Sequence, residues 1–279
     1  MRARPPAVAG LFYPGGPAEL RRTVDDLIAA AGGAGAPATG AGPPAIGAIA
    51  PHAGYLYSGL TAAHVYARLD VPPACVILAP NHTGLGHARH GGSVFAQGVL
   101  KTPLGDVAVH EDLAAALVAA CPLLEDDPLA HEREHAVEVH LPFLLARRPD
   151  VRVVPIVLGW GDWERSRQLA EALAAVVKGW PEPVLLLASS DMNHYESAAV
   201  GAGKDALALA QVERMDGEEL LAVTARHHVT MCGRTPCAAV LHAAKLLGAA
   251  QAEVVHTSHS GLVTGDDQQV VGYAGVIVR

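Results

Sequence analysis

PAIGAIAPHAGYLYSG, residues 44–59, is the stretch from which the fold of this chain can be worked out. Its apolar run at residues 45–50 predicts a short buried strand, which ends at Pro51 and is followed at once by His52. A helical pattern opens near Ser58, a residue type that favours the N-cap of a helix. Ligands of open α/β sheets bind where buried strands end. His52 therefore marks a candidate site.

The same arrangement occurs twice more along the chain. CVILAP leads into His82, and VLLLASS leads into Asp191 and His194. If the three strands are parallel neighbours, their carboxyl ends meet at one edge of the sheet and the histidines converge on one crevice. Imidazole is a common metal ligand, and two imidazoles with one anionic ligand leave positions open for substrate or oxygen. We predict that His52 and His82 bind a metal, and that His194 is a third ligand or a general acid/base oriented by Asp191.

Helical and strand patterns alternate along most of the 279 residues. This alternation predicts an α/β fold in one domain, residues 1–279, with a central, mostly parallel or mixed sheet flanked by helices. Residues 31–44 read AGGAGAPATGAGPP, a low-complexity segment that we interpret as a flexible surface loop within the domain. Residues 1–14 form an extended arm, whose aromatic side chains indicate that it packs on the body.

Composition excludes several classes of protein. With 51% hydrophobic and 17% charged residues the chain can bury a large core, which excludes a disordered protein. The net charge of −8 and the lack of a dense Lys/Arg stripe argue against nucleic acid as a partner. No uncharged apolar run reaches the ~18 residues of a membrane span. The N-terminus lacks a signal-peptide pattern and the cysteines lack CxxC spacing, so we expect a cytoplasmic protein with free thiols.

Cys232 has two interpretations. It lies in a Thr-Met-Cys-Gly-Arg loop directly before a predicted helix. A cysteine in such a place is often a small buried hydrophobe. Arg234 and the helix N-terminus would both favour the thiolate, which is the form that binds metal. From the residues alone, both interpretations stay open.

The sequence HEREH, from His131 to His135, fits the H-E-x-x-H motif of zinc hydrolases. In that motif two histidines one helical turn apart bind zinc, and the glutamate activates water. The preceding Asp-Asp-Pro favours a helix that begins within the motif, and His140 is out of register for the metzincin continuation. A zinc hydrolase is therefore a lesser alternative. Glu134, His135, Glu138 and His140 are predicted to face the crevice around the metal ligands.

Six motifs occur in a fixed order along the chain: PHAGYLYSG, PNHTG, KTPLG, EHAVEVHLPF, SSDMNH and MCGRTP. From about Ala9 to the C-terminus, this series resembles the Memo family, whose bacterial and archaeal members are called AmmeMemoRadiSam system protein B. The resemblance implies a single α/β domain related to class III extradiol dioxygenases, which hold non-haem iron with two His and one Glu. Memo proteins have Cys in place of that Glu. Matched residue by residue, the implied ligands are His52, His82 and Cys232.

The resemblance also implies a chemistry. His194 matches the acid/base histidine of the dioxygenases, with Asp191 beside it, and the implied cofactor is iron or copper. Thiolate is softer than carboxylate and favours copper(I) or zinc, so zinc is a third candidate and ring cleavage is in doubt. Animal members are described as redox-active and as engaging phosphotyrosine peptides through the pocket. Phe12 replaces the animal Trp here, and no receptor partner is assumed.

We therefore predict a metal-binding redox protein with a dioxygenase-like pocket, which takes an unknown small-molecule or peptide ligand. The family name implies a pathway link to AMMECR1-type and radical-SAM proteins. The alternative is a non-catalytic module that binds a peptide or an anion in a vestigial active site. Residues predicted to line or support the pocket are Phe12, Tyr55, Tyr57, Glu134, His135, His140 and Arg234.

Overall fold

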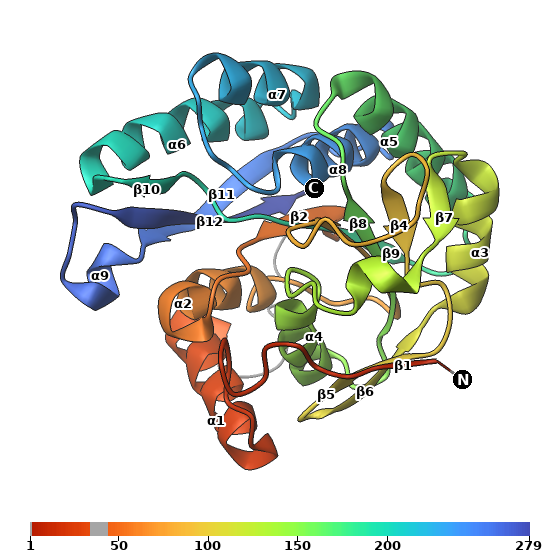
Figure 1. Ribbon diagram of the computed structural model, residues 1–279, viewed down its shortest axis with the longest axis horizontal. Coiled ribbons are helices and arrows are strands. Elements are labelled where there is room, and N and C mark those ends of the chain that lie inside the picture. The colour runs from red at the N-terminus through yellow and green to blue at the C-terminus, as the bar shows by residue number, and fades with distance from the viewer. Residues whose placement is uncertain (1, 34–43) are drawn as a thin grey trace.

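The computed structural model describes residues 2–33 and 44–279, and within them twelve strands join in one mixed sheet (Figure 1). The main path of the sheet has the order β1-β5-β6-β8-β3-β9-β2-β12-β10, while β11 pairs with β12, and β4 pairs with β7 and β8. The strands are β1 (Ala3–Arg4), β2 (Gly47–Ala50), β3 (Ala74–Pro80), β4 (Gly92–Val94), β5 (Val99–Thr102), β6 (Gly105–Val109), β7 (Leu124–Asp126), β8 (Arg152–Leu158), β9 (Val184–Ser189), β10 (His194–Glu196), β11 (Ala252–His259) and β12 (Val270–Val278).

Helices cover both faces of the sheet. Figure 1 shows α5 to α8 on one side and α1, α2 and α4 on the other. Helix α8 packs on β2, β3 and β9, and α2 packs on β2, β11 and β12. The α-helices are α1 (Pro17–Ile28), α2 (Tyr55–Tyr66), α3 (Glu111–Ala120), α4 (Leu141–Arg147), α5 (Trp163–Lys178), α6 (Ala198–Glu213), α7 (Gly217–Arg226), α8 (Arg234–Leu246) and α9 (Gly261–Thr264). The shorter helical turns are η1 (Ala29–Gly33), η2 (Pro128–His131) and η3 (Glu138–His140).

The three strands that precede the candidate histidines are adjacent and parallel. Strand β9 lies between β3 and β2, with Leu78 opposite Ala188 in one pair and Ala50 opposite Ser189 in the other. All residues of these strands are buried, as expected for near-continuous apolar runs that are covered on both faces. The carboxyl ends of the three strands therefore meet at one edge of the sheet. The predicted α/β fold with a mixed sheet is confirmed.

Side chains of the expected types cap several helices. Asp162 accepts a hydrogen bond from the backbone N of Arg165 (2.9 Å) at the start of α5, and Asp216 caps α7 in the same way. Such caps satisfy backbone N–H groups that have no partner within the helix. They explain why the amphipathic segments begin where they do.

Helix α2 begins three residues before the predicted start. Gly54 precedes it, and Ser58 lies inside the helix, where its hydroxyl donates to the carbonyl of Ala53 (2.9 Å). The early start turns Tyr55 into the core. Its hydroxyl donates to the carbonyl of Val139 (2.6 Å), and its side chain is buried.

The segment predicted as a loop at residues 31–44 is helical at its start. Ala29–Gly33 continues α1 as a short turn of π-helix, in which Gly32 has a φ of 83°. A positive φ is favourable for glycine because it has no Cβ. The loop predicted for residues 34–43 lies outside the described residues.

Contrary to the prediction, Glu138 does not face the crevice, because it is fully buried and anchors the N-terminal arm. Glu138 forms an ion pair with Arg4 and accepts hydrogen bonds from the backbone N of Ala7 (2.7 Å) and Val8 (3.0 Å). Tyr13 also donates its hydroxyl hydrogen to Glu138. Because charge, burial and hydrogen bonds coincide, the arm has a defined place on the body, as its aromatic residues indicated.

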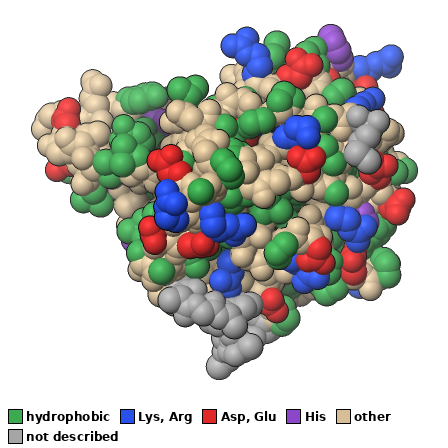
Figure 2. Space-filling view, turned by 90° about the horizontal axis from the view of Figure 1, so that it is seen from below, with side chains coloured by type: hydrophobic (Ala, Val, Ile, Leu, Met, Phe, Trp, Pro, Cys, Tyr) green, Lys and Arg blue, Asp and Glu red, His purple; other side chains and the backbone are tan. Residues whose placement is uncertain are grey.

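The surface carries both signs of charge. On the face shown in Figure 2, Lys and Arg side chains lie among Asp and Glu side chains and do not gather into one basic patch. Within residues 2–33 and 44–279, every helix is too short or too polar to cross a lipid bilayer.

Candidate metal centre

Three side chains that sequence reasoning selected lie together. The ligand atoms of His52, His82 and Cys232 are all within 4.8 Å of one another, a group that could hold a metal ion. His52 follows β2, His82 follows β3, and Cys232 precedes α8. The two imidazole rings are 5.0 Å apart between centroids, and Cys232 Sγ is 3.2 Å from His52 Nε2. The sheet edge thus supplies two of these potential donor atoms, and a loop supplies the third.

Ser189, the last residue of β9, fixes the orientation of His52. Its hydroxyl donates to the carbonyl of Ala136 (2.6 Å). The same oxygen lies 2.6 Å from His52 Nδ1 and 2.8 Å from His140 Nε2. Since the one hydroxyl hydrogen is already used, both ring nitrogens must donate to the oxygen. His52 therefore carries its hydrogen on Nδ1, and the lone pair of its Nε2 is directed at Cys232.

His140 extends this series of hydrogen bonds into the core. Its Nδ1 accepts a hydrogen bond from the hydroxyl of Tyr66 (3.0 Å), and its side chain is fully buried. Burial lowers the pKa of His140 to about 3, and burial is also the main reason why the pKa of His52 lies well below its usual value. Both rings are therefore neutral near pH 7. Through Ser189, His140 supports the orientation of His52 from behind the pocket.

Glu134 orients the second imidazole. Its Oε1 is 2.9 Å from His82 Nδ1, and its Oε2 accepts a hydrogen bond from the backbone N of His82 (2.6 Å). Burial tends to raise the pKa of Glu134, but the hydrogen bond and charge of His82, together with the N–H of Ala136, lower it overall. Metal-binding histidines commonly donate their second nitrogen to a carboxylate in this way. The Nε2 atom of His82 is left for a metal.

The surroundings of Cys232 differ from the prediction. Burial and then the Asp191 carboxylate raise the pKa of the thiol, against a weaker hydrogen bond from the backbone N of Asp191 (3.3 Å). The guanidinium group of Arg234 lies beside Gly161 and is not among the groups that shift the pKa of Cys232. A bound metal cation would release the thiol proton, because thiolate is the ligand form. Arg234 is thus not the cation that activates Cys232.

Contrary to the prediction, Asp191 does not contact His194 within the structure. Asp191 Oδ1 accepts hydrogen bonds from the backbone N of His52 (2.8 Å) and of Ala53 (3.3 Å), so it ties β9 to β2. Burial raises the pKa of Asp191 to about 6. His194 is oriented by Thr230, whose carbonyl is 3.0 Å from His194 Nδ1 and whose Oγ1 accepts from the backbone N of His194 (2.8 Å).

The donor group of His52, His82 and Cys232 opens onto a pocket of about 550 Å³. Its size lies within the range typical of small-molecule sites, about 300–1,000 Å³. Aromatic and imidazole side chains make up much of its wall. The residues that give it this character are Phe12, Tyr57, His135, His194, Tyr195 and Tyr273.

The remaining predicted pocket residues have distinct positions. Phe12 packs edge-on against His135 (4.8 Å between ring centroids), and His135 stacks on His82 (4.9 Å). Tyr57 is partly exposed and lines the pocket. Tyr55 does not line it, because α2 begins at this residue and directs its ring into the core.

The HEREH segment does not form the helix that a zinc hydrolase of the H-E-x-x-H type needs. Helix η2 ends at His131, whose Nε2 is 3.0 Å from the carbonyl O of Ser93. Burial lowers the pKa of His131 to about 4. A second group that could hold a metal contains His135, His82 and Glu134, but both Glu134 oxygens already accept hydrogen bonds. The structure therefore gives the zinc-hydrolase alternative no helical site.

Sequence reasoning missed two supporting residues of the site, Ser189 and Thr230. Ser189 had a signal, because it is a polar residue at the end of an otherwise apolar buried strand. Thr230 had none, because its bond to His194 joins residues 36 positions apart.

Comparison with known proteins covers almost the whole chain. The family model described as "Memo-like protein" matches residues 4–277. A MEMO1 family protein of Aquifex aeolicus is 40% identical over 279 residues, and one of Methanopyrus kandleri is 39% identical over 282 residues. Each alignment spans 99% of both chains. A MEMO1 family protein of Methanocaldococcus jannaschii is 38% identical over 289 residues, spanning 100% of this chain and 99% of its own. The chain therefore belongs to the Memo family.

Proposed function

We propose that this protein is a metal-binding redox protein in which His52, His82 and Cys232 hold iron or copper beneath the pocket. The supporting observation is the donor group itself, two imidazoles and a thiol with their ligand atoms within 4.8 Å. Each imidazole has its Nδ1 engaged by a protein oxygen, which leaves Nε2 for a metal. Imidazole suits both iron and copper, and thiolate adds a preference for copper(I). A metal bound there would supply electron transfer or oxygen activation.

The protein's own residues supply proton transfer and positioning. His194 faces the pocket, and Thr230 fixes its Nδ1, so Nε2 is the atom that accepts or gives a proton. Burial is the main cause that lowers the pKa of His194, which favours the neutral ring and a role as a base near pH 7. Asp191 positions the backbone of His52 and takes no proton from His194 in this scheme.

The occupant of the pocket is a small molecule or a peptide in this proposal. A cytoplasmic location and a shared pathway with AMMECR1-type and radical-SAM proteins belong to the same proposal. The alternative, a module that binds a peptide or an anion without catalysis, would use the same pocket without a metal.

Metal content tests the proposal directly. Protein purified without oxygen is expected to contain near-stoichiometric iron or copper by mass spectrometry, and His52→Ala is expected to lose it because one of three ligands is gone. His87→Ala, which removes an exposed histidine away from the donor group, is the matched control and should keep the metal. A wild-type protein that lacks metal and also refuses Fe(II), Cu(I) and Zn(II) would contradict the proposal and favour the binding module. A wild-type protein that contains only zinc would contradict the proposed redox function.

Ser189→Ala is expected to weaken copper(I) binding about 10–100-fold, the usual cost of removing a hydrogen-bond partner of a ligand histidine. The substitution leaves the Nδ1 hydrogen of His52 and the Nε2 hydrogen of His140 without their acceptor. Competition with a colorimetric copper(I) chelator measures the affinity. Ser166→Ala removes another buried hydroxyl, one that donates to the carbonyl of Asp162 at the start of α5, and should bind copper like the wild type. Equal affinity in Ser189→Ala and wild type would show that the hydroxyl does not position His52.

A further inference from the structure

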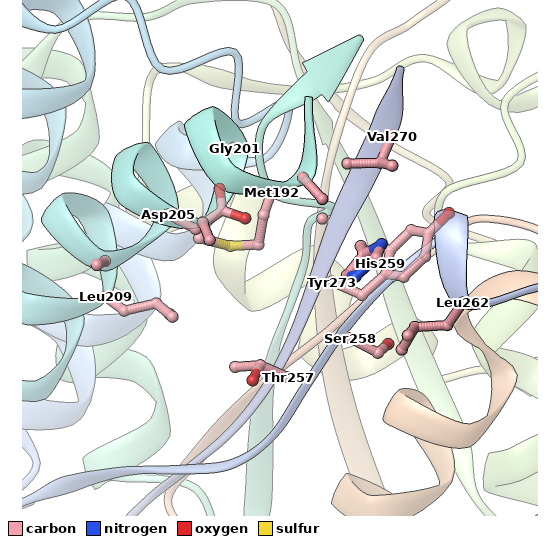
Figure 3. A pocket seen from close by; sticks show the side chains of 14 residues that line it. Met192, Gly201, Asp205, Leu209, Thr257, Ser258, His259, Leu262, Val270 and Tyr273 are labelled. Carbon is pink, nitrogen blue, oxygen red and sulfur yellow. The ribbon is translucent and has the colours of Figure 1, made fainter. Parts of the chain in front are cut away.

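A second hollow, of about 350 Å³, lies between helix α6 and strands β11 and β12 (Figure 3). Its wall is mainly apolar and includes Met192, Leu209, Leu262 and Val270. None of His52, His82 and Cys232 lines it, although Tyr273 contributes to the walls of both this hollow and the first pocket. The proposed metal chemistry does not use it.

Helix α6 keeps this hollow open with small side chains. Ala198, Ala202 and Ala206 line it, together with Gly201. These positions recur every three or four residues, so they share one face of the helix. Asp205 belongs to the same face and is the acidic residue among those that line the hollow. The helix thus offers a cavity with one carboxylate in its wall.

The carboxylate of Asp205 has a fixed position. Its Oδ1 accepts a hydrogen bond from the backbone N of Asn193 (2.8 Å). Its Oδ2 lies against Gly272 on β12, where a Cβ atom would come within 2.1 Å of this oxygen. A side chain at position 272 would therefore displace the carboxylate. Figure 3 shows the Asp205 carboxylate beside the Met192 side chain.

The charge of Asp205 has no partner within residues 2–33 and 44–279. No side chain there donates a hydrogen bond to Oδ2, and no Lys, Arg or His nitrogen lies within 4.0 Å of it. The neighbouring Lys204 is paired with Glu196 instead (2.8 Å). Burial raises the pKa of Asp205 to about 6, so most of the carboxyl is still ionised near pH 7. Within the described part of the chain, Oδ2 is therefore left to accept a hydrogen bond from a cation in the hollow.

We propose that this hollow binds a small organic ammonium ion, with its N–H groups donating to Asp205 Oδ2 and its apolar body against Met192 and Leu209. The cavity volume lies within the range typical of small-molecule sites, about 300–1,000 Å³. The unpaired carboxylate favours a cationic ligand. The apolar wall favours a hydrocarbon group over a hydrated metal ion.

The methionine methyl groups provide a site-specific test on the full chain. The sequence has four methionines, of which Met192 lines the hollow and Met215 is buried elsewhere. With ¹³C-methyl methionine, benzylammonium is expected to shift the Met192 resonance saturably and leave Met215 in place. Benzyl alcohol, a neutral probe of similar shape, is expected to bind at least tenfold more weakly. No shift of Met192, or equal affinity for the two probes, would overturn the proposal.

Two variants distinguish the contribution of the Asp205 charge to binding from that of the cavity. Asp205→Asn keeps an oxygen for the N–H of Asn193 and removes the charge, so the preference for benzylammonium over benzyl alcohol should disappear. Ala206→Leu fills the hollow from an exposed helix position and should abolish binding of both probes. An unchanged benzylammonium affinity in Asp205→Asn would overturn the proposal. Metal content should be unchanged in both variants, so this test stands or falls separately from the metal proposal.

Discussion

Cys232→Ser is expected to lower the affinity for copper(I) by more than about 100-fold, beyond the about 10–100-fold cost of losing a partner behind a ligand. The hydroxyl that replaces the thiol is a harder and far less acidic donor, and copper(I) prefers sulfur. The Cys232 sulfur lies 3.2 Å from His52 Nε2, and it is the one sulfur in the donor group of His52, His82 and Cys232. Chelator competition under anaerobic conditions measures the affinity.

Two controls sharpen this prediction. His194→Ala removes a pocket imidazole outside the donor group and should cost much less copper affinity than Cys232→Ser. Cys121→Ser removes a buried thiol that is not part of the donor group and tests for unspecific effects of losing a cysteine. Equal losses in Cys232→Ser and His194→Ala would argue that Cys232 is not a ligand.

Arg4→Met is expected to lower the free energy of unfolding by about 3–5 kcal/mol, the cost of removing one partner of a buried ion pair. Arg4 and Glu138 are both buried, and Arg4 also donates to the backbone carbonyl of His131 (3.0 Å). Loss of the guanidinium leaves the Glu138 charge in the core, with only the N–H groups of the arm and Tyr13 to stabilise it. Urea denaturation followed by circular dichroism measures the change.

Arg2→Ala is the matched control, since the same arm carries both arginines. Arg2 pairs with Asp126 at 2.7 Å in an exposed position, and pairs of that kind contribute about 0–1 kcal/mol. Comparable losses for Arg4→Met and Arg2→Ala would contradict the anchoring role of Glu138.

The middle of the sheet was predictable because β2, β3 and β9 are apolar runs, each followed within five residues by a histidine. Their order was not, because local sequence does not state which strands pair. The hairpin of β5 and β6 shows the same limit, because its strands, of four and five residues, are too short and too polar to recognise in the sequence. The start of α2 at Tyr55 was missed because Gly54 caps it without a side-chain hydrogen bond.

The donor group was predictable for a different reason. His52 and His82 repeat one arrangement, and the family resemblance added Cys232. The partners of these residues were hidden, because Ser189 contacts His52 across 137 positions. Closeness in sequence also misled the interpretation of Asp191, which turns back to β2 instead of toward His194. Local patterns identify reactive side chains better than the groups that orient them.

The donor group joins residues that leave the ribosome at very different times. His52 and Cys232 are 180 positions apart, and β2 pairs with β9 and β12, which are made much later. A nascent chain that ends before residue 232 can present imidazoles but not the thiol. Pairings over such distances form late in folding, because the intervening chain must first be ordered. In the proposed metal site, insertion of the ion would therefore follow synthesis of most of the polypeptide, and it would act on a chain whose central sheet is already assembled.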